Sequence, residues 1–243
     1  NPDLEKRLTK QSVRAIAYEG VENRDGSLPI LKPMSEVAGR MAVFIGAGYL
    51  SKNQGGSGIL LSGTPTVAGG HVVILGAGTV GENALHLAMR LGASVHLFDR
   101  NEARLKAFTR QYGAALITDL PSPASIERAL LEADLAIGAI HLPGAKTPHL
   151  VSRKMVCRMK KGSVIVDVSI DQGGCFETSR PTTHSNPVYT VNGVRHYCVP
   201  NIPGIVSRTA TIALTQATLP FICEIADKGL SRACSENRSL AAG

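Results

Sequence analysis

The sequence predicts an α/β protein built on a doubly wound parallel sheet, with remnants of a second α/β domain. Two observations lead to this prediction. Short and almost continuously apolar segments alternate with segments whose apolar residues recur every three or four positions. Strands and helices have these patterns when a parallel sheet is covered by helices on both faces. In addition, residues 71–100 place three glycines between such a strand and such a helix.

Residues 71–100 read HVVILGAGTVGENALHLAMRLGASVHLFDR. Each glycine of the turn has a different expected task. Gly76 permits the tight turn, Gly78 lets the backbone approach a pyrophosphate, and Gly81 lets the helix pack close to the strand. Thr79 and Val80 lie between these last two glycines, where the unpaired N–H groups of a helix start favour a diphosphate.

Asp99 ends the second apolar run, eighteen residues after Gly81. A carboxylate at this place accepts hydrogen bonds from both ribose hydroxyls and repels a 2′-phosphate, which favours NAD over NADP. The neighbouring cation Arg100 weakens that preference. A lone glycine motif is weak, but the strand before it, the helix after it and the acid at this distance predict a Rossmann-type dinucleotide-binding domain.

Composition narrows the function classes. Of the 243 residues 44% are hydrophobic and 19% are charged, so the chain can bury a sizeable core. The net charge is +7, but the aromatic content is only 4% and there is no long basic run, which argues against nucleic-acid binding. No apolar run reaches the eighteen residues that span a bilayer, and the polar start has no signal-peptide pattern.

The five cysteines form no C-x-x-C pair. Their odd number and spacing argue against a disulfide framework and against a structural zinc site. They indicate a reducing compartment, hence the cytoplasm. Cys175 lies beside the expected site, where it is either a reactive thiol or, as we favour, a small residue in a tight turn.

Before the glycine turn, the chain predicts three features. Val13–Tyr18 is expected as a strand, the tail of a second domain that lies mostly before Asn1. Ser35 is expected to cap a helix that connects the two domains. The loop Gln54–Gly58 resembles a phosphate cradle, but it lacks the Walker lysine and Ser/Thr, so we interpret it as a mobile loop or a turn.

After Asp99 the alternation continues. The expected helices and strands are a helix at 102–112, a strand at 114–117, a helix at 125–132, a strand at 134–140, a helix at 152–159, strands at 163–168 and 194–199, and a last helix at 207–228. The tail after it is expected to fray.

Asp171 follows the apolar strand at 163–168, where doubly wound proteins carry their chemistry. A carboxylate there can hold an ammonium group or position a water molecule, although Asp also commonly caps turns. His184 and His196 lie nearby as possible acid–base groups, but lone histidines are more often structural. Arg180 is either a carboxylate ligand or a structural residue.

Five stretches together resemble the alanine dehydrogenase family, which also includes the NAD-binding part of proton-pumping transhydrogenase. The stretches are DGSLPILKPMSEVAGRMA, VVILGAGTVGENA with the acid at 99, AIGAIHLPGAKTPHLVS, VDVSIDQGGCFETSRPTTH and YCVPNIPGIVSRTAT. The resemblance spans nearly the whole chain. The family's substrate-binding arginine and lysine and its catalytic histidine would precede Asn1, and none of the seven histidines here matches that histidine.

The resemblance implies NAD-dependent, reversible oxidative deamination of L-alanine to pyruvate and ammonia. It implies a catalytic role for Asp171. It places Ser35 at the pyrophosphate, Ile140 and Leu142 near the nicotinamide or its ribose, and Asn201 at the carboxamide side of the site. Three of these also have an ordinary structural explanation: Ser35 as a cap, Ile140 as a core residue and Asn201 as a turn residue. Lys146 is either a cofactor contact or a surface residue.

The resemblance also implies a domain order and an assembly. Residues 1–33 are expected as a remnant of the catalytic domain, 34–206 as the NAD-binding domain with the connecting helix at its start, and 207–243 as a helix that returns to the catalytic domain. The family usually forms hexamers, so a homo-oligomer is expected. Two alternatives stay open: an NAD(H)-binding module without deaminating activity, and a transhydrogenase-like component.

Overall fold

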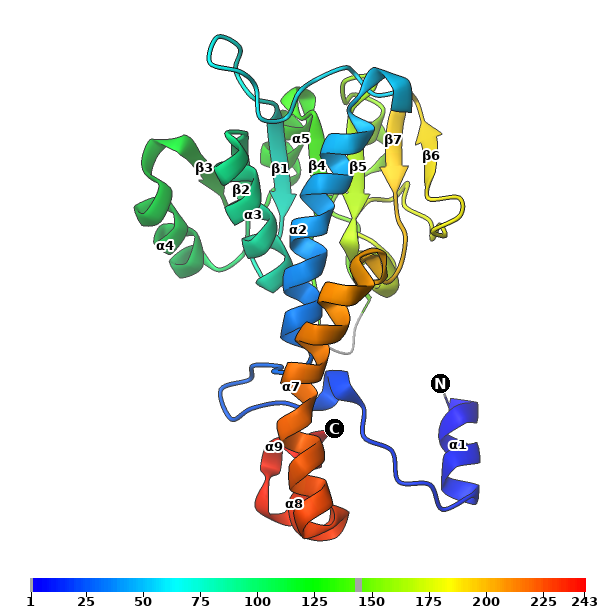
Figure 1. The fold of residues 1–243 in the computed structure, drawn as a ribbon. Coiled ribbons are helices and arrows are strands. Elements are labelled where there is room, and N and C mark those ends of the chain that lie inside the picture. Colours follow the sequence, from blue (N-terminus) through cyan, green and yellow to red (C-terminus); the bar gives the residue numbers. More distant parts are fainter. Residues whose placement is uncertain (1, 143–145) are drawn as a thin grey trace. The chain divides into compact units, whose positions relative to one another are not determined.

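The computed structural model describes residues 2–142 and 146–243 (Figure 1). The chain divides into two compact units. One comprises Glu36–Ile205, and the other comprises Asn1–Ser35 with Val206–Gly243. The first unit contains the sheet.

The sheet has seven strands in the order β3-β2-β1-β4-β5-β7-β6. Neighbouring strands are parallel except β6, which pairs antiparallel with β7 at one edge. The predicted doubly wound parallel sheet is thus confirmed, with one antiparallel edge strand added. The strands are β1 (His71–Leu75), β2 (Ser94–Phe98), β3 (Leu116–Asp119), β4 (Leu135–Gly138), β5 (Val164–Asp167), β6 (Val188–Val191) and β7 (Val194–Tyr197).

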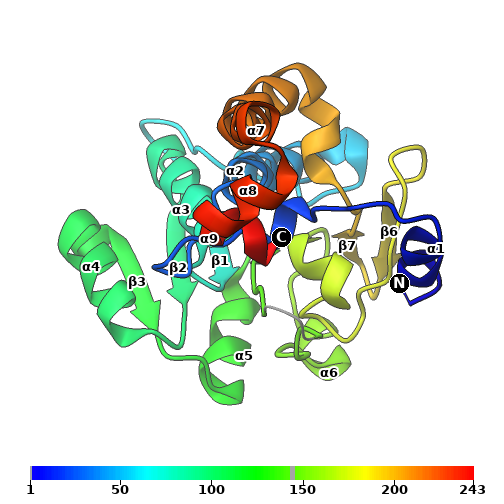
Figure 2. The same cartoon turned by 90° about the horizontal axis from the view of Figure 1, so that it is seen from below.

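Helices cover both faces of this sheet (Figure 2). Because successive side chains of a strand point to opposite faces, Ile74 and Leu75 of β1 belong to two separate core clusters. Ile74 lies in the cluster on the side of α2 and α3, and Leu75 lies in the cluster on the side of α5 and α6. The helices are α2 (Leu31–Tyr49), α3 (Thr79–Leu91), α4 (Glu102–Tyr112), α5 (Pro123–Glu132) and α6 (Arg153–Val156).

Two predictions for the first 49 residues were wrong. Val13–Ala17 has no regular structure and Tyr18–Gly20 is a 3₁₀ turn, so the expected strand is absent from the described residues. Ser35 is the fifth residue of α2, which begins at Leu31, so Ser35 does not cap this helix. The helix can start before Pro33 because the N–H groups of a first turn have no intrahelical acceptor, and a proline there loses nothing.

Other differences are smaller. The helix expected at 152–159 is the single turn α6, and the edge strand β6 was not predicted. The predicted bounds of the last helix agree with α7 (Ser207–Lys228). The tail is ordered rather than frayed, because α8 (Leu230–Glu236) and α9 (Arg238–Ala242) follow α7.

Hydrogen bonds hold the second unit together across its two chain segments. The N–H of Ala17 donates to the carbonyl of Gly243 at 2.9 Å, and the Arg14 guanidinium donates to the Ser231 hydroxyl at 2.9 Å. Within the tail, Asn237 caps α9, and its amide donates to the Glu224 carboxylate at 2.6 Å. These contacts explain why the tail stays helical.

The helical stretch Ile202–Lys228 is long and apolar enough to cross a membrane, by length and composition only. Its most apolar window has a mean hydropathy of 1.2, and 11% of that window is buried. The criterion of a continuous apolar run missed this stretch because threonines such as Thr209, Thr211 and Thr215 interrupt it. One such helix is weak evidence, since helices of water-soluble proteins pass the same test.

Candidate functional site

The structure brings most of the predicted site residues to the carboxyl ends of the sheet's parallel strands. Gly76 follows β1, Asp99 follows β2, Ile140 lies just beyond β4, Asp171 lies beyond β5, and Asn201 lies beyond β7. These five strands are parallel, so their carboxyl ends all lie at the same end of the sheet. The strand order reverses between β1 and β4, which is where doubly wound folds bind their ligands.

The glycine turn has the geometry that the sequence predicted for each glycine. Gly76 has a φ of +102°, and a Cβ there would lie 2.6 Å from the carbonyl oxygen of Ala139. A Cβ at Gly81 would overlap the carbonyl oxygen of Gly76. A Cβ at Gly78 would have no heavy atom within 4 Å. The first and third glycines are therefore required by the fold itself, whereas the second faces open space.

The start of α3 offers free hydrogen-bond donors. Within the described ranges, the N–H groups of Gly78, Thr79, Val80 and Gly81 donate to no protein acceptor. The first bond of this turn is donated by the N–H of Glu82 to the carbonyl of Gly78 at 2.8 Å. Four free donors at a helix N-terminus beside an uncrowded glycine fit a diphosphate group.

The loop Gln54–Gly58 differs in this respect. The N–H groups of Gly55, Gly56, Ser57 and Gly58 donate to the carbonyls of Lys52, Ser51, Gly162 and Leu50, at 2.7–3.0 Å. A loop whose N–H groups are all occupied cannot cradle a phosphate. The interpretation of this segment as a turn is therefore confirmed.

Asp99 is fixed beside the glycine turn. Its Oδ2 accepts a hydrogen bond from the N–H of Ala77 at 2.6 Å, and its Oδ1 accepts one from the N–H of Asn101 at 2.7 Å. The Arg104 guanidinium lies 3.9 Å from Oδ2, and the Asp99 side chain is 15% exposed. Each carboxylate oxygen keeps a lone pair that can accept from a sugar hydroxyl.

Asp171 lies in the 3₁₀ turn Val168–Gln172 that follows β5. Its side chain is exposed at the surface of this turn. Partial desolvation raises the pKa of its carboxyl above the ordinary value. No hydrogen bond or ion pair within the described residues engages this carboxylate, which leaves it available to a ligand.

The turn that carries Asp171 is built around the fully buried Asp167. The Asp167 carboxylate accepts hydrogen bonds from the N–H of Cys175 at 2.9 Å and from the Ser179 hydroxyl at 2.6 Å. It also accepts one from the N–H of Ser169 at 3.2 Å. Burial raises the pKa of Asp167 above the ordinary value, and this effect outweighs the hydrogen bonds from Ser179, Phe176 and Cys175, which lower it. Cys175 is itself fully buried, and burial raises the pKa of its thiol well above the ordinary value, which supports the packing interpretation of this cysteine.

Side chains of the same turn hold the segment after β4. The Ser169 hydroxyl accepts from the N–H of Ile140 at 2.9 Å. The Gln172 amide accepts from the N–H of Leu142 at 3.1 Å and donates to the carbonyl of Leu142 at 2.9 Å. Sequence reasoning singled out Ile140 and Leu142 but missed Ser169 and Gln172. The sequence offers only a weak signal for them, because Ser169 and Gln172 are polar residues shortly after a buried strand, with the apolar Ile170 between them.

Asn201 has a φ of +58°, in the left-handed region that asparagine tolerates better than most residues. Its carbonyl accepts from the N–H of Gly204 at 3.0 Å, which closes the turn after β7. Ser35 belongs to the other compact unit, so its role stays a prediction. Lys146 is exposed, and the preceding residues 143–145 of the same predicted loop lie outside the described residues.

His196 is fully buried and has a partner at each ring nitrogen. Its Nδ1 lies 3.0 Å from the carbonyl of Val194, and its Nε2 lies 2.8 Å from the Thr178 hydroxyl. The Tyr189 ring stacks on the imidazole at 5.0 Å, and the Arg180 guanidinium lies over the Tyr189 ring at 4.1 Å. Desolvation lowers the pKa of His196 to about 4, so the ring is neutral at physiological pH. These contacts favour the structural interpretation of His196.

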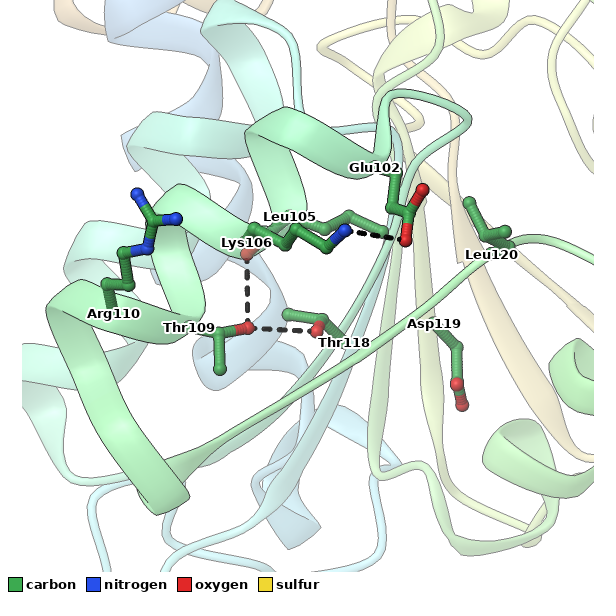
Figure 3. A pocket seen from close by; sticks show the side chains of 8 residues that line it. All are labelled: Glu102, Leu105, Lys106, Thr109, Arg110, Thr118, Asp119 and Leu120. Carbon is green, nitrogen blue, oxygen red and sulfur yellow. Dashed lines mark hydrogen bonds and ion pairs between the residues drawn. The ribbon is translucent and has the colours of Figure 1, made fainter.

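A hollow of about 420 Å³ lies between α4 and β3, at the far edge of the sheet (Figure 3). Four of its polar side chains pair with one another: Lys106 binds Glu102 at 2.9 Å, and the Thr109 hydroxyl lies 3.0 Å from that of Thr118. None of the predicted site residues lines it. Within the described residues, no group of three or more His, Cys, Asp or Glu side chains is arranged to hold a metal ion.

Known proteins similar to this chain agree on one family. Residues 42–243 match the family model "Alanine dehydrogenase/PNT, C-terminal domain". The chain is 51% identical over 240 residues to an alanine dehydrogenase of Halomonas elongata, which covers 99% of this chain and 65% of that protein. It is 51% identical over 243 residues to an alanine dehydrogenase of Bacillus subtilis, which covers 100% of this chain and 64% of that protein.

Among solved structures, an alanine dehydrogenase is more similar to this chain than a transhydrogenase is. An L-alanine dehydrogenase superposes with a TM-score of 0.95 at 48% identity, over 99% of this chain and 66% of that one. A transhydrogenase from Sinorhizobium meliloti superposes with a TM-score of 0.75 at 25% identity, over 91% of this chain and 64% of that one. The chain thus spans about 65% of the length of the curated relatives. Its sequence over residues 42–243, its strand order and its glycine turn show that the chain belongs to the alanine dehydrogenase/PNT C-terminal domain family.

Proposed function

We propose that this chain is the NAD-binding part of an alanine dehydrogenase, an oxidoreductase that converts L-alanine reversibly to pyruvate and ammonia. The observation that supports this most is the 51% identity, along the full chain, to proteins named alanine dehydrogenase. The free donors at the start of α3 and the carboxylates of Asp99 and Asp171 at one sheet edge agree with it.

The residues present fit a nicotinamide dinucleotide. The N–H groups of residues 78–81 would bind the pyrophosphate, and Asp99 would accept the hydroxyls of the adenosine ribose. Ile140 and Leu142 would lie near the nicotinamide or its ribose, with Asn201 at the carboxamide side. Ser35 would contact the pyrophosphate. NAD is preferred over NADP in this proposal because the Asp99 charge opposes a 2′-phosphate.

When bound, the cofactor supplies a hydride acceptor for the alanine α-carbon. The ionised Asp171 would hold the substrate ammonium group, which gives up one proton to water before the α-carbon loses its hydride. The carboxylate would later orient the water that attacks the resulting iminium carbon. Its exposed position suits both tasks, as does the lack of a partner for its carboxylate among the residues that the structure describes. The turn that carries Asp171 would keep its carboxylate in position, because hydrogen bonds attach this turn to the buried Asp167.

The wider organisation is also part of the proposal. Residues 1–33 and 207–243 would belong to the catalytic domain, and 34–206 would form the NAD-binding domain. The protein would act as a homo-oligomer, a hexamer by family resemblance, in the cytoplasm, on small molecules and without nucleic acid or a membrane. The apolar stretch Ile202–Lys228 would then be covered by protein rather than by lipid.

Two other functions stay in competition. A binding module would hold NAD(H) without oxidising alanine, and a transhydrogenase-like component would exchange hydride between nucleotides. The higher identity and TM-score of the alanine dehydrogenase, 48% and 0.95 against 25% and 0.75, favour the first proposal over the transhydrogenase.

The test is alanine-dependent NADH formation followed by absorbance, with the 243-residue chain and with the natural full-length protein. Activity in either sample supports the dehydrogenase. A folded full-length protein that binds NADH but never oxidises alanine would instead support the binding module. Hydride exchange between two nicotinamide nucleotides, without alanine, would support the transhydrogenase-like function.

A further inference from the structure

Gln172 makes contacts that neither turn geometry nor core packing requires. It directly follows Asp171 and is half-buried. Its carboxamide pairs with the main chain of Leu142 through two hydrogen bonds, in the way that two peptide groups pair in a sheet. Its own carbonyl accepts from the N–H of Thr147 at 2.8 Å. Gln172 therefore holds two points of the segment that follows β4.

The hydrogen bond of Ser169 adds a third point, the N–H of Ile140 at 2.9 Å. Both tethering residues lie in the turn that carries Asp171, and this turn is itself fastened to Asp167. The carboxylate and the segment at Ile140 and Leu142 are consequently held to one support. A displacement of one would be transmitted to the other through the amide of Gln172.

We propose that Gln172 is a positioning residue that sets the segment at Ile140 and Leu142 relative to the carboxylate of Asp171. This inference rests on the proposed function, in which this segment contacts the nicotinamide end of the cofactor and Asp171 contacts the substrate. Hydride transfer is sensitive to the distance between the donor and acceptor carbons, so a loosened segment slows the reaction more than it weakens binding.

The direct test replaces Gln172 by methionine, which has a similar length but cannot form the two hydrogen bonds. Gln111→Met is the matched control, because Gln111 is exposed on α4 and makes no side-chain hydrogen bond in the described structure. In the full-length protein we expect kcat to fall about tenfold or more, with the KM for alanine unchanged within about twofold. The Kd for NADH should rise about threefold to tenfold, because the segment loses its two tethers.

A second measurement separates positioning from a merely structural role. Hydrogen exchange at the Leu142 amide should accelerate in Gln172→Met while Tm stays within about 2 °C of the wild-type value. Ser169→Ala, which removes the tether to Ile140, should lower kcat in the same direction. Unchanged kcat and NADH affinity despite faster exchange at Leu142 would overturn the proposal, and so would unchanged exchange at Leu142.

The outcome is distinguishable from failure of the proposed function. If the wild-type protein does not oxidise alanine, the function fails, but NADH affinity and Leu142 exchange can still be compared between Gln172→Met and Gln111→Met. A weaker NADH complex in the first variant alone then supports the positioning role. Equal NADH affinities would contradict it.

Discussion

The carboxylate of Asp99 accepts a hydrogen bond from the backbone N–H of Ala77 at 2.6 Å. This bond joins the end of β2 to the glycine turn after β1. It places a negative charge beside a helix N-terminus whose first N–H groups have no acceptor in residues 2–142 and 146–243. One part of the site thus attracts a diphosphate, and the adjacent part accepts hydroxyl donors but opposes a further phosphate.

Asp99→Ala should weaken NADH binding about 10- to 100-fold and bring the affinities for NADH and NADPH closer together. The first effect follows from the loss of charge-assisted hydrogen bonds to the ribose, and the second from the loss of repulsion toward a 2′-phosphate. Arg104, which lies 3.9 Å from the carboxylate, would then be free to pair with that phosphate. Fluorescence titration with both nucleotides measures the change.

The control for this variant is Asp119→Ala. Asp119 ends the neighbouring strand β3 and binds His96 at 3.0 Å, away from the glycine turn. It should leave both nucleotide affinities unchanged. If Asp99→Ala behaves in the same way, the ribose assignment of Asp99 is wrong.

Gly78→Ala should weaken NADH binding without changing stability, whereas Gly81→Ala should lower stability. At Gly78 the backbone has a φ of −69°, which alanine adopts freely, and the added methyl group faces open space. Stability should therefore stay unchanged, whereas the Kd for NADH should rise about tenfold or more because the methyl group occupies the phosphate approach. At Gly81 the methyl group would overlap the Gly76 carbonyl oxygen, so unfolding free energy should fall by about 1–3 kcal/mol.

Urea denaturation and NADH titration of the two variants provide this comparison, each variant serving as the control of the other. Equal losses of stability would mean that Gly78 is a fold glycine like Gly81. Unchanged NADH affinity in a folded Gly78→Ala protein would remove the pyrophosphate from this turn.

The sequence was most informative where structure is local. The segment from β1 to Asp99 follows from apolar periodicity and glycine spacing, which are visible within residues 71–99 alone. The two hydrogen bonds between the Gln172 side chain and the main chain of Leu142 could not be predicted. They join residues thirty positions apart, whose proximity depends on the pairing of β4 with β5. Similarly, Asp167 belongs to the predicted strand, but the sequence holds no sign that its carboxylate accepts five hydrogen bonds from residues 169–179.

His196 should affect stability rather than the catalytic pH profile. Its pKa is about 4 in the folded protein and close to 6.5 when unfolded. The unfolded chain therefore takes up the proton first as pH falls. The stability linked to the neutral ring is fully present above about pH 6.5 and is lost between about 6.5 and 4, by up to about 3 kcal/mol.

Urea unfolding at neutral and acidic pH tests this, with His196→Gln as the variant and the exposed His184→Gln as the control. The loss of stability on acidification should shrink only in His196→Gln. A change in the pH dependence of kcat in His196→Gln, without a change in stability, would instead assign His196 an acid–base role.

Asp171→Asn should abolish alanine oxidation while leaving the Kd for NADH within about twofold of the wild-type value, because the carboxylate contacts substrate rather than cofactor in the proposed function.

The wild-type rate should require the ionised carboxylate. Since partial desolvation raises the pKa of Asp171, activity should be lost as pH falls through a value above that of an ordinary aspartate. Any residual rate in Asp171→Asn should lack this acid limb. Steady-state kinetics across pH, combined with NADH titration, measure both effects. Weakened NADH binding together with a lowered Tm would show instead that Asp171 serves the turn between β5 and Gly173.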